Sequence, residues 1–198
     1  VYDPQADGWH PLAKMSTARS ALGLAVVGGK IYAIGGIAGG TTLESVEAYD
    51  PQLGSWALVA SMSAKRRLHA SVVLDGKIYA MGGCGLGPSH ELDTVEVYDS
   101  QADSWQQVAS MPRCLWTHAA AAMGGKIYVT GGFNQGVSKS VFVYDPQDDA
   151  WTPLASMSIG RHSHASAVVS GKLYVFGGFS AGVTLYTAEV YDPASDSW

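Results

Sequence analysis

The chain has 198 residues, of which 47% are hydrophobic and 24 are glycine, which excludes a disordered chain and is typical of short strands joined by tight turns. No apolar run approaches the roughly 18 residues that a membrane helix needs, and the basic side chains behind the formal net charge of -5 are too few to suggest a nucleic-acid partner. The two cysteines, Cys84 and Cys114, suggest neither a disulfide framework nor a CxxC metal site, so we expect a reducing, cytoplasmic location.

Residues 1–15 begin in the middle of a pattern. They contain a Tyr-Asp pair at Tyr2 and a tryptophan at Trp9, and the chain stops at residue 198 in the same phase. We therefore expect residues 1–15 to form the last two strands of an incomplete repeat, and the whole chain to be a segment of a longer protein.

The first complete repeat, residues 16–61, contains four strand-like runs. They are ALGLAVV (21–27), KIYAIGG (30–36), ESVEAYD (44–50) and SWALVAS (55–61). Their length, their β-branched and aromatic content and the glycines between them favour strands over helices. A glycine-containing turn between the first two runs allows the positive φ of a tight hairpin.

The same pattern returns at intervals of 46 to 49 residues, with the second run reading KIYAMGG, KIYVTGG and KLYVFGG. Four short strands per period are typical of a β-propeller blade. We therefore expect an all-β propeller of four four-stranded blades plus a partial one, with blades at 16–61, 62–110, 111–156 and 157–198 and the last strand truncated. The first strand of each repeat is rich in small residues, which suits the innermost position, where blades crowd the axis.

Two arrangements satisfy this pattern. Residues 9–15 could supply the missing last strand and close a ring of four blades, or the chain could be an open arc of a larger ring. We favour the arc, because both ends carry the same segment and one copy would be surplus in a closed ring. An open arc leaves strand edges that need further blades or another chain.

The loops of variable length and most cationic side chains are predicted to lie on one face. The loops after the second and fourth strands of each repeat point the same way, and insertions confined to one face of a repeat protein usually mark its binding face. Guanidinium groups on this face would bind the carboxylates of an acidic peptide. The alternative is that the arginines pair with neighbouring acids.

The doubled glycine after an apolar-Tyr run, followed by Tyr-Asp and Trp at fixed spacing, resembles the kelch repeat over the whole chain. In kelch-like substrate adaptors of cullin ubiquitin ligases, the partner contacts the arginine that opens the first strand, the residue after it and the residue after the glycine pair. The resemblance therefore implies contacts from Arg19, Ser20, Ile37, Arg66, Arg67, Cys84, Trp116, Phe133, Asn134, Arg161, His162 and Phe179. Leu115 departs from the arginine pattern and Phe142 from the glutamate pattern, so repeat three should have a less charged rim.

Trp116 and Phe133 are expected to form an apolar anchor in that repeat. Three histidines, His69, His118 and His164, share one repeat position, but hydrogen bonding to backbone between blades is favoured over a metal site. We expect no cofactor and no catalytic residue, because the sequence contains no nucleophile elbow, phosphate loop or zinc helix motif.

The resulting hypothesis is a non-catalytic module that binds a protein or acidic peptide, possible alternatives being a structural scaffold subunit or a sugar-acting kelch enzyme of the mutarotase or oxidase type. The hypothesis predicts that replacing Arg19, Arg66 and Arg161 weakens binding without lowering thermal stability.

Overall fold

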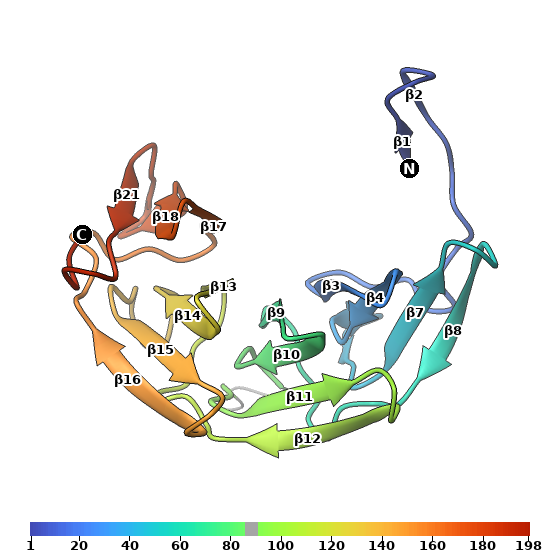
Figure 1. The fold of residues 1–198 in the computed structure, drawn as a ribbon, viewed down its shortest axis with the longest axis horizontal. Helices are drawn as coiled ribbons and strands as arrows, with labels where there is room; N and C mark the ends of the chain where they lie inside the picture. The colour runs from blue at the N-terminus through green and yellow to red at the C-terminus, as the bar shows by residue number, and fades with distance from the viewer. Residues whose placement is uncertain (86–90) are drawn as a thin grey trace.

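A computed structural model describes residues 1–85 and 91–198, and their regular structure is entirely β. The sheets stand side by side in an open arc, with the N-terminal hairpin at one end and the last sheet at the other (Figure 1). This confirms the predicted all-β propeller fold. Three of the blades have four strands and the fourth blade has three.

The first blade contains β3 (Gly23–Val27), β4 (Lys30–Ile34), β7 (Val46–Asp50) and β8 (Ser55–Val59). The second contains β9 (Ala70–Leu74), β10 (Lys77–Met81), β11 (Val95–Asp99) and β12 (Ser104–Val108). The third contains β13 (Ala119–Met123), β14 (Lys126–Thr130), β15 (Val141–Asp145) and β16 (Ala150–Leu154). The fourth contains β17 (Ala165–Val169), β18 (Lys172–Phe176) and β21 (Ala188–Tyr191).

Three small hairpins complete the strands. The N-terminal pair is β1 (Tyr2–Asp3) with β2 (Gly8–Trp9). The loops after the glycine pairs of blades 1 and 4 contain β5 (Ile37–Ala38) with β6 (Thr41–Thr42), and β19 (Phe179–Ser180) with β20 (Val183–Thr184). Sequence reasoning did not predict these loop hairpins.

Within each blade, consecutive strands pair antiparallel, and the first strand lies innermost. β3 contacts β9, β9 contacts β13, and β13 contacts β17 across the blade boundaries. The small side chains of these strands therefore allow neighbouring blades to approach closely at the axis. The apolar core lies between blades, where buried residues such as Ile34, Met81 and Val129 pack in clusters.

The recurring tryptophans tie each blade to the one before it. The indole Nε1 of Trp105 donates to the carbonyl oxygen of Ala60 at 2.9 Å, and Trp56, Trp151 and Trp198 do the same with Ala13, Ala109 and Ala155. Asp103 adds a second bond, because one carboxylate oxygen accepts from the Ala60 N–H at 2.8 Å and from the Tyr98 hydroxyl at 2.7 Å. The fixed Tyr-to-Trp spacing is thus explained by packing between blades.

The glycine pairs are required by close approach as well as by backbone conformation. Gly35 and Gly36 have φ of 57° and 96°, a region that disfavours other residues. A Cβ on Gly35 would lie 2.5 Å from the carbonyl oxygen of Arg66 in the next blade. The Gly36 N–H donates to this same carbonyl at 2.9 Å.

Candidate functional site

In every blade, the loop before the first strand meets the loop that follows the glycine pair. Single antiparallel bridges join the residue after the arginine position to the residue after the glycine pair: Ser20 with Ile37, Arg67 with Cys84, Trp116 with Phe133, and His162 with Phe179. Eight of the twelve predicted contact residues therefore lie together as four pairs, one per blade. We call this surface the loop face.

A line of backbone hydrogen bonds connects these pairs from blade to blade. The N–H of Leu68 donates to Ala21, that of Thr117 to Leu68, and that of Ser163 to Thr117, at 2.9, 2.9 and 2.8 Å. All four residues have φ between 52° and 55°, in the left-handed region that non-glycine residues rarely adopt. The inner rim of the loop face is thus held by a repeated, strained conformation.

The three arginines that open the first strands are not available to a partner. The guanidinium groups of Arg19, Arg66 and Arg161 are 0% exposed and contact Glu47, Glu96 and Glu189 at 2.6, 2.7 and 2.7 Å. The prediction that they bind an acidic peptide is therefore wrong, and the alternative that they pair with neighbouring acids describes the structure. The charge pattern of the sequence could not separate these two cases, because both place arginine at the same positions.

Each buried pair is part of a larger hydrogen-bonded unit. Arg66 Nη1 donates to the carbonyl oxygens of Gly82 and Thr94 at 2.9 and 3.1 Å, while Glu96 accepts from the N–H groups of Ser63 and Ala64 at 2.7 and 3.2 Å. Burial alone would raise the pKa of Glu96, but the Ser63 N–H and the Arg66 guanidinium outweigh it and hold that pKa below its ordinary value. The pair thus joins two loops of its own blade, the one before β9 and the one between β10 and β11.

Blade 3 replaces this unit as a whole. Leu115 stands in place of the arginine and Phe142 in place of the glutamate, and both are buried in the apolar cluster between blades 2 and 3. Pro112 stands where Ser63 donates its N–H in blade 2. A proline has no N–H to leave unpaired, so all three residues change together.

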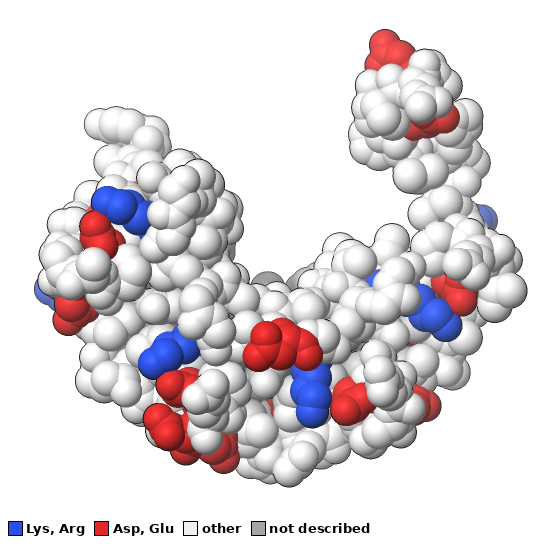
Figure 2. Space-filling model, in the orientation of Figure 1, with Lys and Arg blue, Asp and Glu red and all other residues white. Residues whose placement is uncertain are grey.

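The cations of the opposite face are also paired. Lys30, Lys77, Lys126 and Lys172 contact Asp50, Asp99, Asp145 and Asp192 at 3.1, 3.6, 2.9 and 2.9 Å. In the view of Figure 2, cationic and acidic side chains are interspersed, and no continuous patch of one sign forms. A binding site is therefore better sought in local shape and in cations without a carboxylate partner.

An aromatic cluster crosses the boundary between blades 3 and 4 on the loop face. The ring centroids of Trp116 and Phe133 are 5.0 Å apart, those of Phe133 and His162 are 5.6 Å apart, and those of His162 and Phe179 are 5.8 Å apart. Trp116, Phe133 and His162 are half-buried, and Phe179 is exposed. We call these four residues the rim aromatic cluster.

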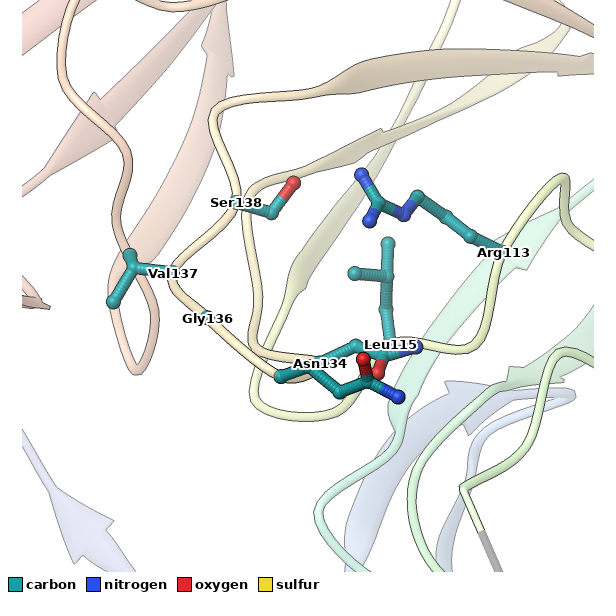
Figure 3. A pocket seen from close by; sticks show the side chains of 7 residues that line it. Arg113, Leu115, Asn134, Gly136, Val137 and Ser138 are labelled. Carbon is teal, nitrogen blue, oxygen red and sulfur yellow. The ribbon is translucent and has the colours of Figure 1, made fainter.

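A pocket of about 410 Å³ and another of about 570 Å³ flank the loop that follows Phe133. The larger one lies between blades 3 and 4, beside Phe133, Val137 and Lys139, and is closed on the blade 4 side by Ser180 and Ala181. The smaller one contains Arg113 and Asn134 (Figure 3). Arg113 and Lys139 are among the cationic side chains expected on this face, but neither was selected as a site residue, because no cation recurs at its position in the other repeats.

The remaining predicted contacts are Ser20, Ile37, Arg67 and Cys84 in blades 1 and 2, and Asn134 in blade 3. Ser20 is exposed and Ile37, Arg67 and Cys84 are partly exposed. Burial raises the pKa of the Cys84 thiol, although Arg67 opposes the shift. Asn134 donates its side-chain N–H to the carbonyl oxygen of Cys114 at 2.9 Å, which fixes the start of the blade 3 loop.

The three repeated histidines pack between blades. His69 and His118 are buried, and their ring nitrogens have no hydrogen-bond partner, whereas His164 Nε2 lies 2.8 Å from the hydroxyl of Thr130. Within residues 1–85 and 91–198, no group of three or more His, Cys, Asp or Glu side chains could hold a metal ion. The same residues contain no helix long and apolar enough to cross a membrane.

Comparisons with known proteins identify the repeat. The sequence matches the family described as Kelch motif over four segments, 18–63, 65–112, 117–158 and 160–198. Kelch-like protein 5 from Homo sapiens is 44% identical over 45 residues, which are 23% of this chain and 6% of that protein. The chain thus spans a small part of the length of this curated relative.

The solved structure of YjhT shares the fold. It is 20% identical in sequence with a TM-score of 0.80, and the match covers 91% of this chain and 65% of that chain. At this identity the likeness concerns the fold alone. Because the family matches nearly the whole sequence and each match contains one blade's strands, the chain belongs to the kelch-motif family.

Proposed function

We propose that this chain is a non-catalytic protein-interaction module that binds a peptide or protein partner on the loop face of blades 3 and 4. The rim aromatic cluster is the observation that carries the proposal. Trp116 and Phe133 present apolar surface beside a pocket large enough for a side chain, and tryptophan is enriched among residues that dominate interface energies. A partner side chain that is aromatic or aliphatic fits this pocket.

The charge preference of the partner now depends on other residues than the three buried arginines. Lys139 lies exposed at the pocket between blades 3 and 4, and none of the ion pairs in the described part of the chain includes it. A cation beside an apolar pocket favours a partner in which a carboxylate lies near an apolar side chain. We therefore propose that the partner is a segment with both apolar and acidic residues.

Selection from a random peptide library displayed on phage tests this function. Peptides captured by the wild-type chain should share an apolar residue, and their binding should fall at least tenfold in W116A/F133A, because the double variant removes the anchor. Tyr186 is 98% exposed in the blade 4 loop and lies outside the cluster, so Y186A is the matched control. Equal binding by W116A/F133A and the wild type, with both folded by circular dichroism, would refute the proposal.

The substrate-receptor role in a ubiquitin ligase is the finer form of this proposal. It rests on the sequence resemblance to kelch-like adaptors. In cells, a reporter protein that carries a selected peptide should be ubiquitinated in the presence of the wild-type protein and not in the presence of W116A/F133A. If a partner binds but its ubiquitination does not change, the proposal of an interaction module would stand and the ligase role would be rejected.

A scaffold role is supported by a different surface. At the ends of the arc, the side chains of Leu24 and Val26 in the first blade and of Phe176 and Val190 in the last are exposed. Another chain that packs on these faces would bury them. Light scattering that shows a dimer at micromolar concentration, lost in V26K or F176K, would favour this second function, and a monomer would count against it.

A further inference from the structure

We propose that the pocket around Arg113 in blade 3 is a carboxylate-binding subsite that receives an aspartate or glutamate side chain of the partner. The inference deepens the proposed function and rests on it for the identity of the partner. It adds a second anchoring point, on the other side of the loop that follows Phe133.

In blades 1, 2 and 4, the space between the loop before the first strand and the loop after the glycine pair holds the arginine of the buried unit. Arg161, for example, donates to the carbonyl oxygens of Gly177 and Thr187 at 2.7 and 3.2 Å. The side chain of Leu115 is shorter and apolar. A pocket of about 410 Å³, lined in part by Leu115, lies at this position in blade 3.

Arg113 brings a charge back to this region, but on the solvent side. The equivalent residues of the other blades are Thr17, Ala64 and Ile159, whose N–H groups contact the buried glutamates. In blade 3 the glutamate is absent, and the Arg113 side chain extends into the pocket toward Ser138 (Figure 3). Its Nη1 makes one long contact, 3.4 Å to the hydroxyl of Ser140.

No carboxylate neutralises this guanidinium, since Arg113 belongs to none of the ion pairs found among residues 1–85 and 91–198. By contrast, Lys65 of the preceding blade's loop pairs with Glu44 at 3.5 Å. Arg113 therefore retains several N–H donors in the fork geometry that matches a carboxylate.

The pocket supplies further polar groups around that position. Ser138 is 8% exposed and lines the pocket, and its Oγ accepts from the Ser140 N–H at 3.1 Å, which leaves the hydroxyl proton free to donate. Asn134 lines the opposite side and is held by its bond to Cys114. A guanidinium, a hydroxyl donor and an amide around a concave site fit a carboxylate better than an apolar group.

The subsite lies next to the apolar pocket, because Gly136 and Val137 of the loop between them line both. A peptide that crosses this loop would place an apolar side chain against Phe133 and a carboxylate against Arg113. The two subsites together define the partner as a short segment with an apolar and an acidic residue close in sequence. This specificity distinguishes blade 3 from the other blades, where Thr17, Ala64 and Ile159 stand at the position of Arg113.

Nuclear magnetic resonance of the chain tests the subsite without a partner. The Arg113 Nε–Hε signal, assigned with R113Q, should shift saturably when N-acetylglutamate is added, while K65Q should behave as the wild type. A shift of Arg113 no larger than that of the other arginines would overturn the proposal. Tighter saturation by inorganic phosphate than by N-acetylglutamate would assign the pocket to phosphate and also overturn it.

Peptide binding provides the second measurement. A selected peptide with an acidic residue should bind R113Q about tenfold more weakly than the wild type, and replacing that residue by its amide should weaken binding to the wild type but not to R113Q. Unchanged affinity in R113Q would reject the carboxylate subsite alone. Failure of the proposed function is distinguishable, since it appears as unchanged binding in W116A/F133A.

Discussion

Arg66 and Glu96 form an ion pair at 2.7 Å in which the guanidinium is 0% exposed and the carboxylate 2%. Such a pair is expensive to desolvate, and removing one partner leaves an uncompensated buried charge. Around it, backbone carbonyls and N–H groups of two loops are satisfied by the same two side chains. The relationship is therefore structural, and it holds the two loops of blade 2 on the loop face together.

Replacing Arg66 with alanine should lower the free energy of unfolding by about 3 to 5 kcal/mol, because Glu96 would remain buried without its partner. This outcome reverses the expectation from sequence that such variants keep their thermal stability. Denaturant titration of R66A measures it. R113Q is the matched control, since Arg113 has no carboxylate partner in the described residues and its loss should change stability by less than 1 kcal/mol.

In blade 3, Pro112, Leu115 and Phe142 replace the whole unit. Transferring these three residues to blade 2 as S63P/R66L/E96F replaces both charges and removes the Ser63 N–H, which makes the shorter of the two backbone contacts of Glu96. Exchange of a buried ion pair for apolar residues is often neutral, so we expect the triple variant to lose less than half of what R66A loses. A triple variant less stable than R66A would show that blade 3 is accommodated by other differences.

Much of the fold follows from the spacing of a few residues. The glycine pairs, the Tyr-Asp pairs and the tryptophans define four repeats, and the predicted strands 30–36 and 44–50 agree with β4 and β7 to within two residues. The pairing of Trp116 with Phe133 is likewise as the predicted strand directions imply. Periodic residues report periodic contacts, and these are what a repeat sequence reveals.

Whether the arginines are exposed or buried could not be predicted from this spacing. A recurring arginine opposite a recurring glutamate is compatible with a charged rim and with a buried pair, and only the three-dimensional position of Glu96 beneath the loops decides between them. The two pockets beside the loop that follows Phe133 depend on residues that break the repeat, such as Leu115 and Lys139. Their neighbours come from loops of different length, whose path a spacing pattern does not determine.

The left-handed backbone conformation at the inner rim leads to a further prediction. Ala21 has φ of 52°, a conformation that costs a residue with a Cβ roughly 1 kcal/mol relative to glycine. Ala21→Gly should therefore raise the stability of the chain by about that amount. Ala25→Gly, within β3, should lower it, because glycine weakens a strand and a buried methyl group is lost. Thermal unfolding of the two variants makes the comparison, and equal destabilisation by both would contradict the strain.

The N-terminal hairpin lacks one of the bonds that join the other blades. Asp103, Asp149 and Asp196 each accept an N–H from the preceding blade, but the same position in blade 1 is Gly54, with φ of 65°. Gly54→Asp should therefore create a bond to the Ala13 N–H and slow its hydrogen exchange several-fold. Gly54→Ala should not. If the exchange rate at Ala13 is the same in both variants, then Ala13 does not approach residue 54 as Ala60 approaches Asp103.

The buried histidines should make stability fall in mild acid. Burial lowers the pKa of His118 to about 4, and the charge of Arg66 opposes protonation further. In the unfolded chain the pKa is about 6.5, so below that pH the unfolded state binds a proton that the folded state does not. The free energy of unfolding should therefore decrease as the pH falls from about 6.5 to about 4, by up to about 1.4 kcal/mol per pH unit for each such histidine.

His118→Leu isolates this contribution, because Leu22 occupies the same position in blade 1 and shows that the site accepts an apolar side chain. Urea titrations at a series of pH values should give a shallower decline for the variant between pH 6.5 and 4. Below about pH 4, both proteins should lose stability together as Glu47, Glu96 and Glu189, whose pKa values are lowered in the folded chain, become protonated. Parallel curves across the whole range would mean that His118 takes up its proton as readily in the folded chain as in the unfolded one, and that its burial between the blades is relieved in solution.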